Sequence, residues 1–179
     1  MSITTKTGDG GMTGLMYNRR VPKSHPQVEA YGAVDELNAA LGLARVAAGA
    51  SSAAGRLLDI QKHLVGLMGE LATAPEDRTR YQRDGFEVIA PAQTEKLDQE
   101  IRALEASGIG FVSGWVMPGD SLRSATLDAA RTACRRAERR VSALRDSDEG
   151  QNPEILVYLN RLSDLLWLMA READRGEPG

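Results

Sequence analysis

The chain has 179 residues, of which 42% are hydrophobic and only 4% aromatic, and its formal net charge is −3. This composition suits one domain with an apolar core, favours helices over a sheet, and argues against non-specific binding of nucleic acid. The only cysteine, Cys134, excludes an internal disulfide framework, and no stretch predicts a membrane span or a signal peptide, so we expect a cytosolic protein.

The first distinctive stretch is rich in glycine. Residues 4–14, Thr-Thr-Lys-Thr-Gly-Asp-Gly-Gly-Met-Thr-Gly, hold four glycines in eleven positions, together with Lys6 and several hydroxyl groups. Glycine lets backbone N–H groups approach an anion closely, and hydroxyl and ammonium groups add further donors. This composition is typical of a phosphate-binding loop, although it matches neither the P-loop nor the dinucleotide-binding pattern. A flexible N-terminal tail is the alternative.

Apolar residues then recur at steps of three or four, as they do in helices that bury one face. We expect five helices, over about residues 26–48, 52–73, 92–106, 121–146 and 152–173. Pro26 and Pro153 suit the first turns of two of them, and Gly108 suits the end of another. Residues 75–91 mix both charge signs without a helical period, which indicates a surface loop. The sequence therefore predicts an all-α bundle in a single domain.

The fourth of these helices is rich in arginine. Residues 121–146 contain seven arginines, no lysine and three acidic residues. On a helix, Arg131, Arg135 and Glu138 share a stripe beside the buried face that Cys134 occupies. Two other arginines point more nearly away from the core: Arg136 and Arg139. Because guanidinium groups match phosphate oxygens, this face predicts an anionic ligand. The alternative is a solvated, arginine-rich flank.

The first helix repeats this layout, with a polar stripe of Tyr31, Asp35 and Asn38 beside its apolar residues. A carboxylate beside a core is costly unless it is paired, so we expect a partner for Asp35, with Arg131 as the candidate. The alternative is that Asp35 is simply an exposed helix residue.

A turn-rich connection precedes the arginine helix and contains Trp115 between a glycine and a proline. Such an aromatic residue serves either as an anchor packed on the bundle or as an apolar lid over a ligand. The sequence leaves both alternatives open.

Four segments, taken together, match the pattern of a known family. They are Thr5-Lys-Thr-Gly-Asp-Gly-Gly-Met-Thr-Gly14, Val28-Glu-Ala-Tyr-Gly-Ala-Val-Asp-Glu-Leu-Asn38, Arg131-Thr-Ala-Cys-Arg-Arg-Ala-Glu-Arg139 and Tyr158-Leu-Asn-Arg-Leu-Ser-Asp164. In this order they resemble the PduO-type ATP:cob(I)alamin adenosyltransferases over nearly the whole chain. The resemblance implies a single domain, residues 1–179, in which a five-helix up-down bundle (26–175) assembles as a homotrimer. It also implies active sites between subunits and an N-terminal loop (1–25) that becomes ordered over bound ATP.

The same resemblance implies an activity and its ligands. The 5′-deoxyadenosyl group of ATP passes to the cobalt of cob(I)alamin, giving adenosylcobalamin and triphosphate, and Mg²⁺ accompanies the ATP. Because the attacking cobalt carries no proton, the reaction needs no general base. The partners it implies are a reductase that supplies cob(I)alamin and an enzyme that depends on adenosylcobalamin. A corrinoid or nucleotide carrier with little turnover is the first alternative function, and a purely structural bundle is the second.

The resemblance also assigns residues to tasks. The residues it implies for ATP binding are Thr5, Lys6, Thr7, Gly8, Thr13, Gly14, Lys23, Arg135, Arg136, Glu138, Arg139 and Asn160. The residues it implies for catalysis are Arg131, Arg135, Asp35 and Trp115. It further implies that Arg131 forms an ion pair with Asp35 across the subunit interface. Trp115 is implied to displace the axial ligand below the corrin, where the family usually has phenylalanine. The ligands of the metal stay unassigned.

Overall fold

The computed structural model describes residues 4, 6–110, 114–147 and 151–176. Within these ranges it contains two short strands followed by six α-helices. The elements are β1 (Met12–Gly14), β2 (Arg20–Pro22), α1 (Pro26–Ala47), α2 (Ser52–Leu71), α3 (Arg78–Arg83), α4 (Pro91–Ala106), α5 (Leu122–Ser147) and α6 (Glu154–Asp174). The mainly helical fold expected from the sequence is therefore confirmed. No helix in the described ranges is both long and apolar enough to cross a membrane.

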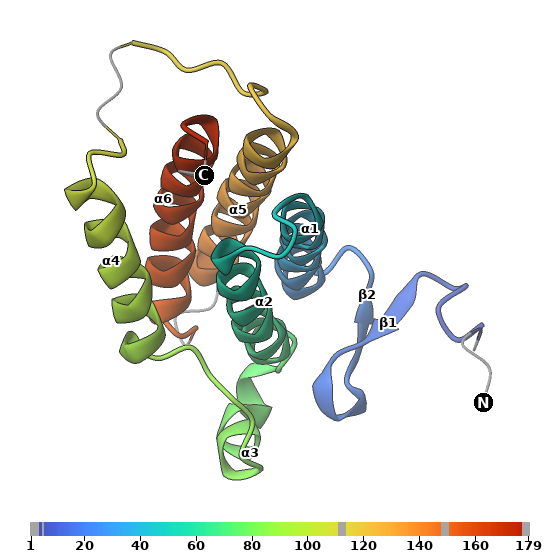
Figure 1. The fold of residues 1–179 in the computed structure, drawn as a ribbon. Helices are drawn as coiled ribbons and strands as arrows, with labels where there is room; N and C mark the ends of the chain where they lie inside the picture. Colours follow the sequence, from blue (N-terminus) through green and yellow to red (C-terminus); the bar gives the residue numbers. More distant parts are fainter. Residues whose placement is uncertain (1–3, 5, 111–113, 148–150, 177–179) are drawn as a thin grey trace.

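The long helices lie side by side in the order α2, α1, α5, α6, α4, and the chain alternates in direction from each to the next along the sequence (Figure 1). This order places the arginine-rich helix, α5, between α1 and α6. One flank of α5 therefore meets α1 and the other meets α6, and this arrangement separates its arginines into two groups.

The helix ends follow the signals in the sequence. At the start of α1, His25 Nδ1 accepts a hydrogen bond from the Gln27 N–H at 3.3 Å. At the start of α6, Asn152 Oδ1 accepts from the Glu154 N–H at 3.0 Å. Gly108, with φ of 80°, follows the end of α4. Each cap satisfies a backbone group that a helix end leaves unpaired, and the left-handed conformation at the end of α4 favours glycine.

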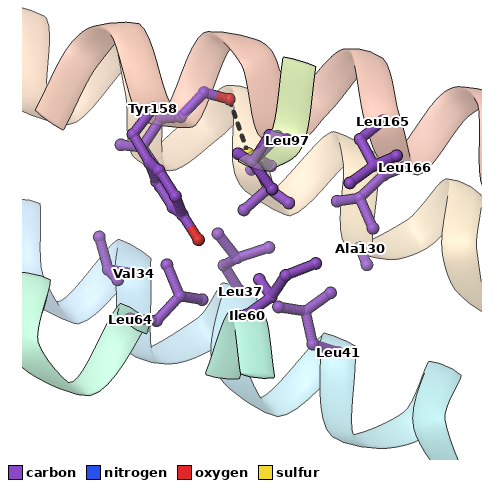
Figure 2. Close-up of a cluster of buried hydrophobic side chains, with 14 of the residues drawn as sticks. Val34, Leu37, Leu41, Ile60, Leu64, Leu97, Ala130, Tyr158, Leu165 and Leu166 are labelled. Atoms are coloured by element: carbon purple, nitrogen blue, oxygen red, sulfur yellow. Dashed lines mark hydrogen bonds between the residues drawn. The ribbon is translucent and has the colours of Figure 1, made fainter. Parts of the chain in front are cut away.

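The core is one cluster of aliphatic side chains from α1, α2, α4, α5 and α6. Figure 2 shows Leu37 and Leu41 of α1 facing α2 and α6, with the Tyr158 ring between the helices. Tyr158 is fully buried, and its hydroxyl lies 3.2 Å from His63 Nδ1. Cys134 lies in the same core, as its place on the apolar stripe predicted, and its thiol donates to a backbone carbonyl of α6 at 3.2 Å. Burial raises the pKa of this thiol.

Residues 75–91 differ from the predicted surface loop. They contain a 3₁₀ turn (Pro75–Asp77) and the six-residue helix α3, in which Tyr81 is only 3% exposed. The Tyr81 ring stacks on Phe86 with centroids 4.7 Å apart, and its hydroxyl donates to the Gly66 carbonyl at 3.4 Å. A six-residue helix is too short to show a hydrophobic period. Because α3 is held mainly by one buried aromatic residue, the sequence did not predict it.

The N-terminal segment also differs from the all-α expectation, because β1 and β2 form an antiparallel hairpin with Thr13 opposite Val21. The hairpin is attached to the end of α2: Leu15 is buried, and the Met16 N–H donates to the Ala72 carbonyl at 2.9 Å. In Figure 1 the hairpin lies outside the bundle, beyond α1 and α2. Strands of three residues are too short to show the alternation by which a sequence predicts a strand.

A second attachment of the hairpin is sensitive to pH. Arg19 Nε donates to Asp77 Oδ2 at 2.7 Å, and this bond lowers the pKa of the Asp77 carboxyl from its ordinary value. Such a carboxyl stabilises the folded state above its ordinary pKa, and the contribution is lost as the pH falls through the lower, folded pKa. We expect the hairpin to loosen below about pH 4. Amide hydrogen exchange at Met16, corrected for intrinsic rates, should report this. In Arg19→Gln that pH response should be absent, and an equal response in both proteins would contradict the assignment.

Candidate functional site

A hollow between α5 and α6 brings together four of the predicted residues. Arg135, Glu138 and Arg139 of α5 and Asn160 of α6 all line it, and its volume is about 570 Å³. Their spacing places the three α5 residues on one helix face. Asn160 Nδ2 donates to Glu138 Oε1 at 3.0 Å, so the amide and the carboxylate fix each other. With Arg161 of α6, which also lines it, the hollow thus offers three guanidinium groups for an anion and a polar pair for a neighbouring hydrogen-bonding group.

A second hollow, between α4 and α6, adjoins the first and shares Arg161 with it; its volume is about 640 Å³. Ile101, Trp167 and Leu168 give it an apolar wall, and acidic residues including Asp164 line its rim. Burial raises the pKa of the Asp164 carboxyl, while the nearby guanidinium groups of α5 and α6 oppose that rise. A large apolar surface beside a cationic one can hold a flat, mostly apolar ligand next to an anionic one.

The sequence did not predict this second hollow, because its residues come from helices far apart in the chain and carry no shared motif. Trp167 gives one signal that was available: it is one of only two tryptophans in the chain. On a helical wheel it lies about a third of a turn from the apolar stripe of α6, near Asn160 and Arg171, so its position outside that stripe was a further available signal.

The glycine-rich loop forms two tight turns before β1. The Gly11 N–H donates to the Gly8 carbonyl at 3.1 Å, and the Arg20 guanidinium of β2 donates to the Thr7 carbonyl at 2.7 Å. Lys23 lies across Gly8, since a Cβ added there would be 3.4 Å from its Nζ. The hairpin therefore gathers most of the residues expected at the phosphates: Lys6, Thr7, Gly8, Thr13, Gly14 and Lys23. Thr5 lies outside the described residues.

The hairpin and the α5–α6 hollow are not brought together within one chain. Among the described residues, the hairpin is hydrogen-bonded to the end of α2 and to the turn that follows it, whereas the hollow lies between α5 and α6, on the far side of α1 (Figure 1). The two groups of residues expected around one ATP molecule are thus on different faces of the bundle.

Arg136 differs from its neighbours on α5. It forms an ion pair with Glu36 of α1, so it faces the α1 flank while Arg135 and Arg139 line the hollow on the α6 flank. The helical wheel predicted that Arg136 and Arg139 point away from the core, and both are exposed, but they lie on different flanks of α5. The reason is the packing order, because α1 and α6 lie on opposite flanks of α5 and a wheel does not show which neighbour covers which flank.

Asp35 is exposed on α1 in the single chain, which corresponds to the alternative of an exposed helix residue and not to burial beside the core. Arg131 instead donates from Nε to Asp128 Oδ1 at 3.0 Å, three residues earlier on α5. No hydrogen bond or ion pair joins Asp35 to Arg131 among the residues that the structure describes. The pairing across a subunit interface is a separate expectation, which a single chain does not test.

Trp115 is 90% exposed in the connection between α4 and α5, so the anchor alternative, in which it packs on the bundle, does not hold in the single chain. Met117 and Leu122 are also more than two-thirds exposed at 71% and 73%. Two large apolar side chains therefore project from this connection and a third from the first residue of α5, which leaves the lid alternative for this segment.

The structure is thus a helical bundle with two adjoining hollows, one lined by guanidinium groups and the other with an apolar wall. Comparison with known proteins makes the class specific. The family model described as "Cobalamin adenosyltransferase" matches residues 3–173. The chain belongs to this cobalamin adenosyltransferase family.

Several characterised relatives are similar to the chain. The corrinoid adenosyltransferase PduO of Citrobacter freundii is 40% identical over 180 residues, which cover 97% of this chain and 50% of that protein. The chain thus spans about half the length of this relative. A corrinoid adenosyltransferase of Bacillus subtilis is 38% identical over 175 residues, covering 96% of this chain and 86% of that protein.

Solved structures are similar as well. A PduO-type ATP:corrinoid adenosyltransferase from Lactobacillus reuteri, in a phenylalanine-to-alanine variant complexed with cobalamin and ATP, matches with a TM-score of 0.87 at 32% identity. The match covers 97% of this chain and 94% of that one. An arginine-to-lysine variant of the same kind of enzyme, complexed with ATP, matches with a TM-score of 0.82 at 30% identity.

Proposed function

We propose that this protein transfers the 5′-deoxyadenosyl group of ATP to the cobalt of cob(I)alamin, giving adenosylcobalamin and triphosphate. The observation that carries the proposal is the pair of adjoining hollows that share Arg161. One presents guanidinium groups suited to phosphates, and the other presents an apolar wall suited to a corrin ring. Membership of the cobalamin adenosyltransferase family supports the same activity.

The chemistry fits the residues that line the hollows. The electron pair of Co(I) attacks C5′ of the ribose in line, the cobalt–carbon bond forms, and the bond from C5′ to the triphosphate oxygen breaks with its electron pair. No proton leaves the nucleophile, so the protein needs no general base. The chain's task is to stabilise the charge that develops on the leaving triphosphate.

We assign that task to cations and donors from two sources. Arg135 and Arg139 supply it from the hollow, with Arg136 close by on the same helix. The glycine-rich loop supplies Lys6, Lys23, its hydroxyl groups and its backbone N–H groups. The bonded pair of Glu138 and Asn160 suits the nucleoside. The described residues contain no cluster of three histidine, cysteine or acidic side chains that could hold a metal ion. We therefore propose that the triphosphate of ATP supplies the ligands of Mg²⁺. No protein side chain is assigned as a metal ligand.

We further propose a homotrimer in which the loop of one subunit (residues 1–25) covers the α5–α6 hollow of its neighbour, within a frame formed by residues 26–175. The separation of hairpin and hollow in one chain supports this assembly, because only a second copy can supply the missing half of the site. The exposed Asp35 then becomes available to Arg131 across the interface. The substrates imply two further partners, a reductant of cob(II)alamin and an enzyme that uses adenosylcobalamin, and they imply a location in the cytosol.

Trp115 tests the corrinoid half of the proposal. Its exposed indole is free to pack against the lower face of the corrin, where an aromatic ring would displace the axial ligand and make cob(II)alamin easier to reduce. Starting from cob(II)alamin with a reductant, ATP and Mg²⁺ under anaerobic conditions, we expect the visible spectrum to convert to that of adenosylcobalamin. Trp115→Ala should slow the conversion at least about tenfold, and Trp115→Phe should retain most of it.

The controls separate this function from its alternatives. Supplying chemically reduced cob(I)alamin should restore much of the rate of Trp115→Ala, because the reduction step is then bypassed. Binding of both substrates without any conversion would favour the carrier function. ATP that leaves the N-terminal residues as accessible to protease as before would favour a purely structural bundle.

A further inference from the structure

A buried ion cluster between α5 and α6 holds Arg131. The Asp128 side chain is 4% exposed and that of Arg171 is 5% exposed. Arg171 Nη2 donates to Asp128 Oδ2 at 2.7 Å, and Arg131 Nε donates to Asp128 Oδ1 at 3.0 Å. One buried carboxylate therefore uses its two oxygens on two guanidinium groups, one from each helix.

Arg171 is fixed in turn from its other side. Its Nε donates to Asp174 Oδ2 at 2.8 Å, and its guanidinium carbon lies 5.7 Å from the centre of the Trp167 ring. A buried guanidinium group must keep its carboxylate partners, because an unpaired buried charge is costly. Asp128 cannot rotate away without leaving Arg171 short of a partner. The orientation of Asp128 is thus set by the core and not by solvent.

The ion pair of Arg131 differs in kind from the exposed ion pairs of the chain. Pairs three residues apart on a helix surface are weak, because both side chains move freely in solvent. Here the acceptor is immobile, and Arg131 is itself only 25% exposed. Across the described part of the chain Arg131 donates through Nε alone. A guanidinium group held at Nε has its plane fixed while its two terminal nitrogens stay available to a further acceptor.

We propose that Asp128, held by Arg171, is a positioning residue that orients Arg131 for its partner outside the chain. The partner is a carboxylate, which we identify as Asp35 of a second copy. This inference rests on the proposed function, because Arg131 has a role there only at the interface between subunits.

A double-mutant cycle on the rate of adenosylation tests the inference. Asp128→Asn keeps the shape of the side chain but leaves one acceptor oxygen for two guanidinium groups. We expect it to lower kcat about tenfold, and to have less than about a twofold effect when Arg131 is already alanine. Arg171→Lys keeps the charge without the fork, so it should give a smaller loss, about threefold, with the same dependence on Arg131.

Arg56→Gln is the matched control. Arg56 has the same exposed fraction as Arg131, 25%, and pairs with Glu172 of α6 at 2.9 Å, but among the described residues it forms no hydrogen bond or ion pair with Asp128. Its substitution should shift the thermal midpoint while changing kcat by less than about twofold, with or without Arg131→Ala. A cycle in which Asp128→Asn and Arg131→Ala act additively overturns the inference.

A second measurement does not depend on activity. In an NMR spectrum of the arginine side chains, the Nε–H signal that disappears in Arg131→Ala should exchange slowly in the wild-type protein and rapidly in Asp128→Asn. Unchanged exchange in Asp128→Asn overturns the inference even if adenosylation is observed. If the wild-type protein makes no adenosylcobalamin, the proposed function fails. The exchange rate of the Arg131 Nε–H still decides, in that case, whether Asp128 positions Arg131. Full activity of Arg131→Ala removes the role of Arg131 and, with it, the inference.

Discussion

Replacing Arg135 by alanine should lower kcat for adenosylation by about 10²–10³-fold. Arg135 lines the α5–α6 hollow beside Glu138 and Asn160. In the proposed function its guanidinium group binds the triphosphate of ATP. Negative charge grows on the triphosphate as the bond between its oxygen and C5′ breaks. The interaction with Arg135 therefore strengthens toward the transition state, and losing it lowers kcat. Initial rates with chemically prepared cob(I)alamin, followed by visible absorbance, measure this effect directly.

Two variants make the result specific. Arg135→Lys keeps the charge but loses the planar fork, so it should fall between alanine and the wild-type protein while still binding ATP. Arg140→Ala is the control on the same helix. The Arg140 side chain is 55% exposed, and its Nη2 lies 3.8 Å from Glu29 Oε2. An exposed pair of this kind contributes little, so its kcat should stay within about twofold. Equal losses in Arg135→Ala and Arg140→Ala would mean that the general charge of α5 matters and the hollow does not.

Replacing Leu37 by alanine should reduce the free energy of unfolding by about 2–5 kcal/mol. Leu37 is fully buried on α1, and Figure 2 shows it in the middle of the cluster where α1 meets the other helices. The substitution removes apolar contacts and leaves a cavity that surrounding helices close only in part. Urea denaturation at a fixed protein concentration measures the change, because assembly would make stability depend on concentration.

Leu37→Met is the control for this loss. It conserves volume and should cost less than about 1.5 kcal/mol. A loss from Leu37→Met as large as that from Leu37→Ala would indicate that the shape of the side chain matters here more than the contacts it makes.

The long helices could be predicted because each repeats one physical pattern over many turns. The apolar residues of α1, α5 and α6 recur at helical spacing, and a capping residue or a proline marks where α1 and α6 begin. The helix α3 and the β1–β2 hairpin lack such repetition. Tyr81 packs against Phe86, and Met16 bonds to Ala72, so these elements depend on contacts that a linear pattern does not contain.

The candidate site divides in the same way. Residues on one helix face, such as Arg135 and Glu138, could be grouped from their spacing alone. The pairing of Asp128 with Arg171 could not, because these two residues are 43 positions apart and a buried charged residue looks like an exposed one in sequence. The opposite error concerns Asp35, whose place beside the apolar stripe suggested burial although α1 leaves it exposed. Burial depends on which neighbouring helix covers a flank, and this is a property of the packed bundle.

The buried thiol of Cys134 has a practical consequence for following the N-terminal loop. It is the chain's only cysteine, it is fully enclosed in the core, and its raised pKa keeps it protonated. A protonated, enclosed thiol reacts slowly with alkylating reagents, because the thiolate is the nucleophile. A cysteine introduced at an exposed loop position such as Asp9 would therefore be the only thiol that a fluorescent maleimide labels. Cys134 therefore does not have to be replaced before labelling. Movement of the loop when nucleotide is added can be recorded as a change in the fluorescence of the attached label.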